Sequence, residues 1–142
     1  MPPNSKEYDK KYYKKNRGEM IANAKPRARQ WIQDNPEKAR FNTKRWRKSN
    51  PLKTRYIGYK SSAKSRGLVF NIDFEEFTKL VSSVCFYCGD IGYGVDRINS
   101  KSGYIKGNYV PCCSQCNVMK LDYTLEEFME KCEKVVNHLK KM

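Results

Sequence analysis

The pattern of apolar and polar side chains predicts a short strand and then a helix near the middle of the chain. Residues 68–72 (LVFNI) are mostly apolar and indicate a short strand. Asp73 follows as a helix N-cap, with Glu76 three residues further on. From Phe74 to Val81 the apolar side chains recur at helical spacing, which predicts a helix that starts at the cap.

A second amphipathic pattern lies near the end of the chain. Thr124 and Glu127 match a capping box, in which each residue bonds the backbone N–H of the other. Behind them, residues 125–139 carry an apolar stripe at helical spacing, and Cys132 lies on it. We therefore expect Cys132 to be a core residue. We also expect this helix and the one before it to cover the segment between them.

The first half of the chain has a different pattern, a loose repeat of an aromatic residue four positions before an asparagine. The repeat stands at Tyr12–Asn16, Trp31–Asn35 and Trp46–Asn50. Asparagine is a preferred N-cap, and proline is favoured in the first helical position. Successive helices are therefore expected to start near Arg17, Pro36 and Pro51. Pro26 is expected to interrupt the first helix, and Gly67 to end the third.

Charge separates the two halves of the chain. Residues 1–66 hold 20 Lys/Arg against 5 Asp/Glu, a balance of +15, whereas residues 67–142 have a balance of −1. The predicted basic helices have little apolar face, so a polyanion is the partner that would stabilise them, and nucleic acid is the usual one. The alternative is a solvated tail that serves solubility. The expected contacts on the second helix are Lys38, Arg40, Lys44, Arg45, Arg47 and Lys48.

Composition limits the compartment and the kind of partner. No stretch approaches the roughly 18 apolar residues of a membrane span, and the N-terminal residues have no apolar core of a signal peptide. We therefore expect no membrane partner. Six cysteines in a chain without a secretion signal favour metal ligation over disulfides. The expected location is intracellular, in a reducing compartment such as cytoplasm or nucleus.

The cysteines form two C-x-x-C pairs. Cys85 and Cys88 make the first pair, and Cys113 and Cys116 make the second. Zinc binds four thiolates as a tetrahedron, so this spacing predicts a structural zinc ion with no open position for catalysis. The alternative is a set of reduced core thiols. An exchange of Cys112 for Cys113 as ligand stays open.

Between the two pairs the sequence predicts a strand, a loop, a second strand and the start of a helix. A hairpin packed on that helix would bring Asp96, Asn108 and Asn117 around one point. Carboxylate and amide oxygens suit Mg²⁺ or Mn²⁺, which keep several waters and accept phosphate oxygens. The expected fold class is α+β, with a basic helical region over residues 1–66 and a zinc-braced module over residues 67–142.

Residues 67–132 resemble the HNH (His-Me finger) endonucleases, in particular phage- and virus-type members with zinc knuckles. The resemblance rests on C-x-x-C, GVDRIN, GY, NYVPCCxxCN and the lysine that follows. It implies a ββα-metal fold with Asp96 and Asn117 as ligands of one Mg²⁺ or Mn²⁺ ion. It also implies that Asn108 orients the base and pins the loop, and that Lys120 neutralises phosphate. Asn117 stands where the family often has histidine, a variant that the family tolerates.

One departure from the family concerns the general base. The position after Asp96 is usually histidine in the family, but here it is Arg97, which holds its proton at physiological pH. Arg97 could instead stabilise charge on the reacting phosphate. Tyr93 or Tyr104 could replace the base, or metal-bound water could lose its proton to solvent. The only histidine, His138, stands near the C-terminus. The structural alternative is a salt bridge between Asp96 and Arg97 that braces the hairpin.

These observations lead to a metal-dependent DNA endonuclease or nickase with Asp96, Arg97, Asn108 and Asn117 at its catalytic site. The alternative is a catalytically degenerate protein on the same scaffold that only binds DNA or RNA. A third interpretation, a structural protein that packs a genome, draws on the same basic half. Charge and aromatic residues do not distinguish DNA from RNA, so the preference for DNA rests on the resemblance.

Overall fold

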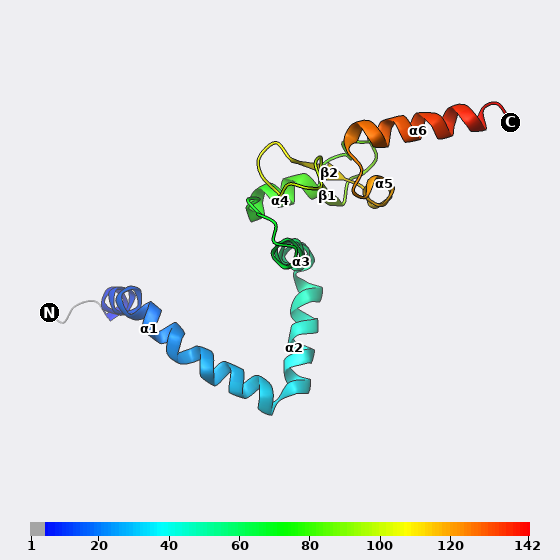
Figure 1. Cartoon of the computed structure of the whole chain (residues 1–142). Helices are drawn as coiled ribbons and strands as arrows, with labels where there is room; N and C mark the ends of the chain where they lie inside the picture. The colour runs from blue at the N-terminus through cyan, green and yellow to red at the C-terminus, as the bar shows by residue number, and fades with distance from the viewer. Residues whose placement is uncertain (1–4) are drawn as a thin grey trace. The chain divides into compact units, whose positions relative to one another are not determined.

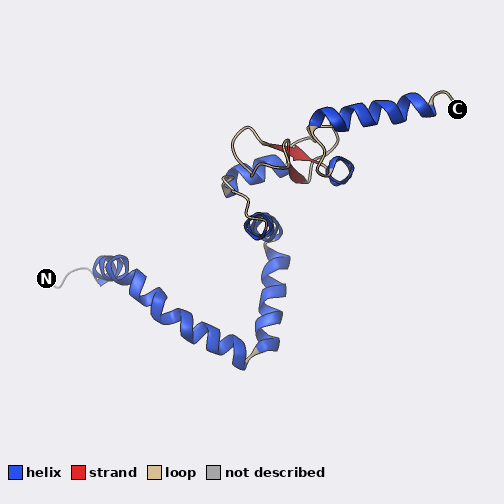
Figure 2. Cartoon of the chain, in the orientation of Figure 1, coloured by secondary structure: helices blue, strands red, loops and turns tan. Residues whose placement is uncertain are grey.

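A computed structural model of the chain describes residues 5–142, and it divides them into two compact units (Figure 1). Residues 1–4, which belong to the N-terminal segment where a signal peptide would lie, are outside the described residues. The first unit ends at Ser49 and holds α1 (Ser5–Asp34) and α2 (Pro36–Ser49). The second unit, Asn50–Met142, holds α3 (Pro51–Ser65), α4 (Phe74–Val81), β1 (Gly94–Arg97), β2 (Tyr109–Cys112), α5 (Ser114–Lys120) and α6 (Leu125–Leu139). The class is α+β, mostly helical with one small sheet (Figure 2).

The helices of the first unit begin only partly where the sequence predicts. The starts at Pro36 and Pro51 are confirmed. The start near Arg17 is wrong, because α1 runs unbroken from Ser5 and continues past Pro26. Asn16 does not cap a helix there, since its side-chain amide donates to the backbone oxygen of Tyr12 (3.0 Å) inside the same helix.

The first unit has little apolar packing of its own. None of its described side chains from residue 6 to residue 49 is buried, and Trp31 and Trp46 are 45 % and 44 % exposed. Helices of this kind gain little stability from packing, so a partner surface would add to it. Among the described residues, no helix combines the length and apolar character that crossing a bilayer requires.

Helix α3 packs with the second unit although its sequence is basic. The core of that unit consists of Ala63, Ile72, Phe77, Val81, Val95 and Tyr104. Tyr56 and Tyr59 of α3 pack against this core, and the Tyr56 hydroxyl donates to the backbone oxygen of Ile72 (3.0 Å). The division between the units therefore falls after Ser49, earlier than the boundary at residue 66 that charge indicates. Charge describes the outer face of α3, whereas its aromatic face decides where the helix packs.

The segment between α3 and α4 is less regular than predicted. Gly67 has a φ of +67°, which suits the residue that ends α3. The strand expected over residues 68–72 is reduced to one parallel bridge between Phe70 and Tyr104. The reason is that only Tyr104 of the neighbouring loop pairs with this segment: its N–H donates to the Val69 oxygen (2.8 Å), and its oxygen accepts the Asn71 N–H (2.9 Å). The N-cap at Asp73 is confirmed.

A short antiparallel hairpin and a helix form the centre of the second unit. Strands β1 and β2 pair so that Asp96 lies opposite Val110 and Arg97 opposite Tyr109. Helix α5 follows β2 after a single residue, Cys113, so the order is strand, strand, helix as the sequence predicts. Helix α4 contacts both strands and carries Phe77 into the core.

Helix α6 covers less of this unit than its apolar stripe suggests. The capping box of Thr124 and Glu127 is confirmed. On the stripe, however, only Phe128 is buried, and its ring meets that of Tyr87 at 5.7 Å. Cys132 is half-buried and is not the core residue that we predicted, while Leu139 is 62 % exposed. The prediction that α6 covers the module therefore holds only near the start of the helix.

Candidate metal centre and hairpin site

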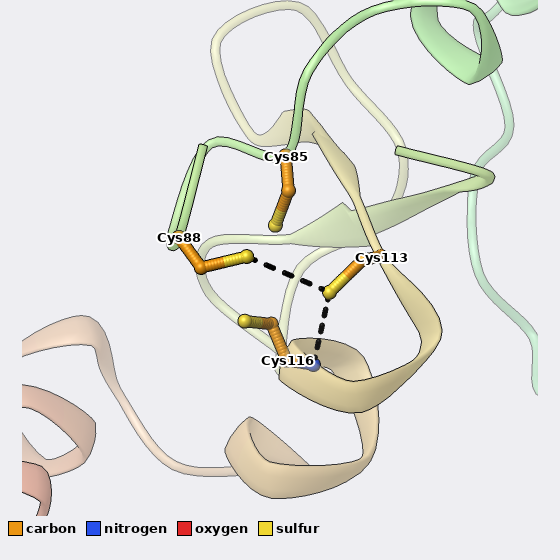
Figure 3. Close-up of side chains that lie close together, drawn as sticks. All are labelled: Cys85, Cys88, Cys113 and Cys116. Carbon is orange, nitrogen blue, oxygen red and sulfur yellow. Dashed lines mark hydrogen bonds between the residues drawn. The ribbon is translucent and has the colours of Figure 1, made fainter. Parts of the chain in front are cut away.

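The two C-x-x-C pairs meet in space. The Sγ atoms of Cys85, Cys88, Cys113 and Cys116 all lie within 4.8 Å of one another. They point toward a common centre from two segments of the chain (Figure 3). The Sγ atoms of Cys88 and Cys113 are 3.8 Å apart. With zinc–sulfur bonds of about 2.3 Å, a tetrahedron has sulfur–sulfur edges of about 3.8 Å, so the four thiols can hold a zinc ion.

Backbone contacts shape each pair. After the first pair, Gly89 has a φ of +79°, and its N–H donates to the Cys85 oxygen (2.9 Å), which closes a tight turn. The second pair opens α5, where the Cys113 thiol accepts the Cys116 N–H (3.4 Å) as a helix cap. The Phe86 N–H also donates to the oxygen of Pro111 in β2 (2.9 Å), which joins the two segments.

The acidity of the thiols is consistent with a cation between them. Burial disfavours the Cys85 thiolate, but backbone N–H groups of the two pairs outweigh it and lower the Cys85 pKa to about 6. Burial raises the pKa of Cys116, and the neighbouring thiols raise it further. Four thiols this close cannot all ionise unless a cation balances them.

Cys112 is not part of the four-thiol group. Its thiol is buried and donates to the Cys113 oxygen (3.1 Å), and burial raises its pKa above the ordinary range. The group that the structure forms uses Cys113 and not Cys112. The exchange of ligand that the sequence left open is therefore not the arrangement of the folded chain.

Asp96 in β1 makes an ion pair with Lys120 at the end of α5. The Lys120 Nζ lies 3.2 Å from Asp96 Oδ2 and donates to the Arg97 oxygen at 2.9 Å. The Lys120 side chain is 0 % exposed. This position does not match the phosphate contact that the resemblance implies for Lys120, because a fully buried ammonium does not reach a nucleic-acid backbone.

Tyr87 links the first cysteine pair to the same carboxylate. Its hydroxyl donates to Asp96 Oδ2 (2.7 Å). Burial raises the pKa of Tyr87, and the hydrogen bond to Asp96 raises it further, so the hydroxyl keeps its proton. Sequence reasoning missed this residue, because a tyrosine inside a C-x-x-C pair gives no signal of the strand it will face.

One oxygen of Asp96 remains available to solvent. Both contacts go to Oδ2, and Oδ1 has no hydrogen-bond partner among the described residues. Every buried side-chain oxygen of the described residues has a partner, so Oδ1 is not buried. Oδ1 therefore reaches solvent. Asn117 is exposed on α5, one helical turn before Lys120, so both side chains leave α5 on one side.

These donors fit a hydrated Mg²⁺ or Mn²⁺ ion in chemistry, since such ions use one or two protein oxygens together with phosphate and water. Among the described residues, the cysteine group is the only cluster of three or more acidic, cysteine or histidine ligands. Lys120 also already balances the carboxylate charge of Asp96. Binding of a divalent ion by Asp96 and Asn117 would therefore depend on oxygens from the substrate.

Arg97 braces the loop that joins the two strands. Its guanidinium donates to the oxygens of Ser100 (2.5 Å) and Ser102 (2.9 Å) and lies over the Tyr104 ring, 5.5 Å from the centroid. Neighbouring side chains on a strand point to opposite faces, so Arg97 and Asp96 do not pair, and the salt bridge considered from sequence is not formed. Tyr104 is buried in the core with its ring packed, which does not suit a general base.

Asn108, the residue before β2, holds the same loop through its side chain. Its side-chain oxygen accepts the Asn99 N–H (2.8 Å), and its amide donates to the oxygens of Asn99 (3.1 Å) and Gly103 (2.8 Å). The loop-pinning part of the role predicted for Asn108 matches these contacts. No histidine takes part in the site, since His138 lies in the last turn of α6 and is exposed.

The basic residues predicted to contact nucleic acid on α2 are all exposed. This set is Lys38, Arg40, Lys44, Arg45, Arg47 and Lys48. Arg45, Arg47 and Lys48 lie in the second half of the helix, and no acidic residue follows Glu37 in α2. The helix therefore presents cations along most of its length.

Fold and site together define a mostly helical α+β protein with a four-cysteine centre able to hold zinc, next to a strand–strand–helix unit. The chain is similar to two viral proteins. It is 42 % identical over 110 residues to Uncharacterized protein R423 of Acanthamoeba polyphaga mimivirus, an alignment that covers 74 % of this chain and 20 % of the relative. It is 34 % identical over 89 residues to an uncharacterized 29.0 kDa protein in the dda-modA intergenic region of Enterobacteria phage T4.

The second alignment covers 56 % of this chain and 36 % of the phage protein. The chain thus spans between a fifth and about a third of the length of the relatives it matches. No family model matches the chain, and no solved structure matches it.

Proposed function

We propose that this chain is a DNA endonuclease or nickase of the HNH type, whose zinc-braced hairpin and helix α5 carry the site. The observation that supports it most is the position of Asp96. One carboxylate oxygen is fixed by Tyr87 and Lys120, and the other reaches solvent. A buried acid with a single accessible oxygen is a typical way to present a hard ligand.

In this proposal the residues of the chain position the substrate. Asp96 and Asn117 hold a Mg²⁺ or Mn²⁺ ion, which when bound stabilises negative charge on the reacting phosphate. Asn108 keeps the loop in place through its three hydrogen bonds. Arg97 is committed to the loop and Tyr87 keeps its proton, so neither is a general base. Base catalysis contributes about 10²–10⁴-fold, and we therefore expect a slow enzyme.

The basic helices bind the nucleic acid. α2 exposes six Lys/Arg side chains of the predicted set, and such contacts release condensed counterions from DNA. The logarithm of the binding constant should fall with the logarithm of salt concentration, with a slope of about −0.9 for each phosphate neutralised on B-DNA. Replacing Arg45 and Lys48 by glutamine should reduce that slope, which fluorescence anisotropy measures.

Plasmid nicking tests the proposed activity. Supercoiled DNA is incubated with the native chain and Mg²⁺ or Mn²⁺, and with the variants Asp96→Asn and Asn117→Ala. Matched controls are Asp122→Ala and Asn137→Ala, which remove the same residue types at exposed positions. Nicking by the native chain and both controls, and not by the site variants, supports the nuclease. Equal background from all five proteins would reject it.

A non-catalytic DNA- or RNA-binding protein on the same scaffold is the second candidate. The contacts of Arg97 and Lys120 favour it, because one replaces the usual base by a loop brace and the other already neutralises Asp96. This candidate predicts salt-dependent binding by the native chain with no nicking. The same two measurements therefore decide between the candidates.

A further inference from the structure

A small cavity lies between α3 and α5, beside the start of β1. Its volume is about 220 Å³, and Arg55, Tyr59, Val95, Ser114 and Asn117 contribute to its walls. Pockets that bind drug-sized ligands measure about 300–1,000 Å³, so this smaller cavity suits a smaller group. The second cysteine pair contributes Cys113 and Ser114 to the walls, whereas Arg55 and Tyr59 carry no motif of their own.

We propose that this cavity binds a single phosphate group of a nucleic-acid backbone, with Arg55 and Tyr59 as its donors. The proposal rests on the proposed function, since it says where the substrate's backbone lies against the hairpin. No Asp or Glu lines the cavity, although Cys112 and Cys113 contribute to its walls. A cation and three neutral polar side chains, from Tyr59, Ser114 and Asn117, form an anion site of the kind that charge-assisted hydrogen bonds favour.

The guanidinium of Arg55 has N–H groups available for a ligand. One terminal nitrogen of its guanidinium donates to the backbone oxygen of Tyr93. The described residues give its other N–H groups no partner, although a guanidinium carries five N–H donors. The bond to Tyr93 thus fixes the group at the rim of the cavity and leaves further donors for an anion.

The Tyr59 hydroxyl has a proton available to donate to a ligand. Its hydroxyl accepts the Val95 N–H (3.0 Å), so the hydroxyl proton is left for another acceptor. Burial raises the pKa of Tyr59 above its ordinary value, which keeps that proton in place. A Cβ atom at Gly94 would come within 2.7 Å of this oxygen, so a glycine here lets the hydroxyl keep its position.

The cavity adjoins the proposed site. Asn117 lines its wall from α5, and Val95 precedes Asp96 in β1. Since Val95 and Asp96 point to opposite faces of the strand, a phosphate in the cavity and the accessible oxygen of Asp96 lie on two sides of one strand. In this proposal the cavity holds a phosphate next to the one that is cleaved, and Asn117 contributes to its wall.

A titration monitored by ¹H–¹⁵N correlation spectra of the full chain tests this inference. The probe is the dinucleotide dTpdT, which has one charged phosphodiester, and the control ligand is its uncharged methylphosphonate analogue. We expect the amide signals of Val95, Ser114 and Asn117 to shift with dTpdT and not with the analogue. Equal shifts with both ligands, or shifts confined to other parts of the chain, would overturn the inference.

Variants make the test specific to Arg55. Arg55→Gln should weaken dTpdT binding about tenfold or more, because a hydrogen bond to a charged group is lost. Tyr59→Phe keeps the packed ring and should weaken binding by a smaller factor. Lys60→Gln removes the same charge from the same helix outside the cavity, and we expect native binding. Equal weakening by Arg55→Gln and Lys60→Gln would contradict the cavity site.

The two proposals fail in different ways. Native zinc content and native spectra in the absence of ligand establish that each variant is folded. If dTpdT shifts the cavity signals but no protein nicks DNA, the nuclease proposal fails and the cavity stands. If Asp96→Asn abolishes nicking while Arg55→Gln changes neither binding nor nicking, the cavity inference fails alone.

Discussion

The ammonium group of Lys120 lies 3.2 Å from Asp96 Oδ2, and the lysine side chain has no exposure to solvent. This pair joins the end of α5 to the middle of β1. Tyr87, which lies between the cysteines of the first pair, donates a hydrogen bond to the same oxygen. The metal-binding segment, the hairpin and the helix therefore meet at one carboxylate. A buried pair of this kind holds parts of a fold in register, since either charge alone would be costly to bury.

Removal of one partner of this pair should destabilise the chain strongly. Lys120→Met leaves the Asp96 carboxylate buried without its cation, and we expect a loss of about 3–5 kcal/mol in the free energy of unfolding. The double variant Lys120→Met/Asp96→Asn should recover much of that loss. Denaturant titration in the presence of zinc measures it. The exposed pair of Lys79 is the control, since Lys79→Met should change stability by less than about 1 kcal/mol. Similar losses for both lysines would contradict the account.

A histidine at position 97 should not create a better nuclease. Arg97 donates to the oxygens of Ser100 and Ser102, and an imidazole ring is too short to reproduce both contacts. Arg97→His is expected to lower stability by about 1–3 kcal/mol and not to raise nicking. Thermal unfolding and the plasmid assay check the two parts. A rise in nicking with unchanged stability would show that Arg97 is not a brace.

The amide of Asn108 should control the mobility of the strand-joining loop. Asn108→Asp keeps the acceptor for the Asn99 N–H but removes both donated bonds, to the oxygens of Asn99 and Gly103. Faster hydrogen exchange is expected in the loop at residues 99–104, with a cost of about 1–3 kcal/mol. Asn137→Asp, at an exposed position in α6, serves as the control. Unchanged exchange in the loop would show that Asn108 does not pin it.

The Tyr109 hydroxyl should lose its proton at a higher pH than an ordinary tyrosine, and the free energy of unfolding should depend on pH in that range. The Tyr109 hydroxyl donates to Glu76 Oε1 (2.5 Å), and this bond raises its pKa from 10.0 to about 12. Because the folded-state value is the higher one, the contribution to stability is present below pH 10.0 and is lost as the pH rises through about 12. Glu76→Gln should return the pKa toward its ordinary value, which phenolate absorbance reports.

Tyr109→Phe should remove one late step from that absorbance titration. Tyr123→Phe, at an exposed tyrosine, serves as the control and should leave that late step in place. If Glu76→Gln left every tyrosine step where it was, the bond between Tyr109 and Glu76 would not govern this ionisation.

Local signals predicted the elements whose residues act within one turn of the chain. The caps at Asp73 and Thr124 and the prolines at positions 36 and 51 all mark helix starts, because each works on neighbouring backbone groups. The spacing of the cysteines likewise predicted which thiols meet. Asn16 shows the limit of such signals, since the same residue type sits inside α1 and bonds back to its own helix.

Contacts between distant segments could not be read in this way. Lys120 looks like an exposed cation in sequence, and only the packing of α5 on β1 buries it. The charge of α3 placed it with the basic helices, although Tyr56 and Tyr59 pack on the core of the second unit. Arg55 lines a cavity because α3 lies against that unit, so its role also depends on tertiary structure.

The zinc content of the purified chain tests the central claim, that the four cysteines bind a metal ion which braces the hairpin site. Elemental analysis should find one zinc per native chain and per Cys132→Ser chain, since Cys132 lies outside the group. Cys116→Ser should lose the zinc and unfold at a markedly lower temperature, as should the native chain after chelation. A native chain without stoichiometric zinc, or a Cys116→Ser chain that keeps native zinc content and stability, would contradict the account.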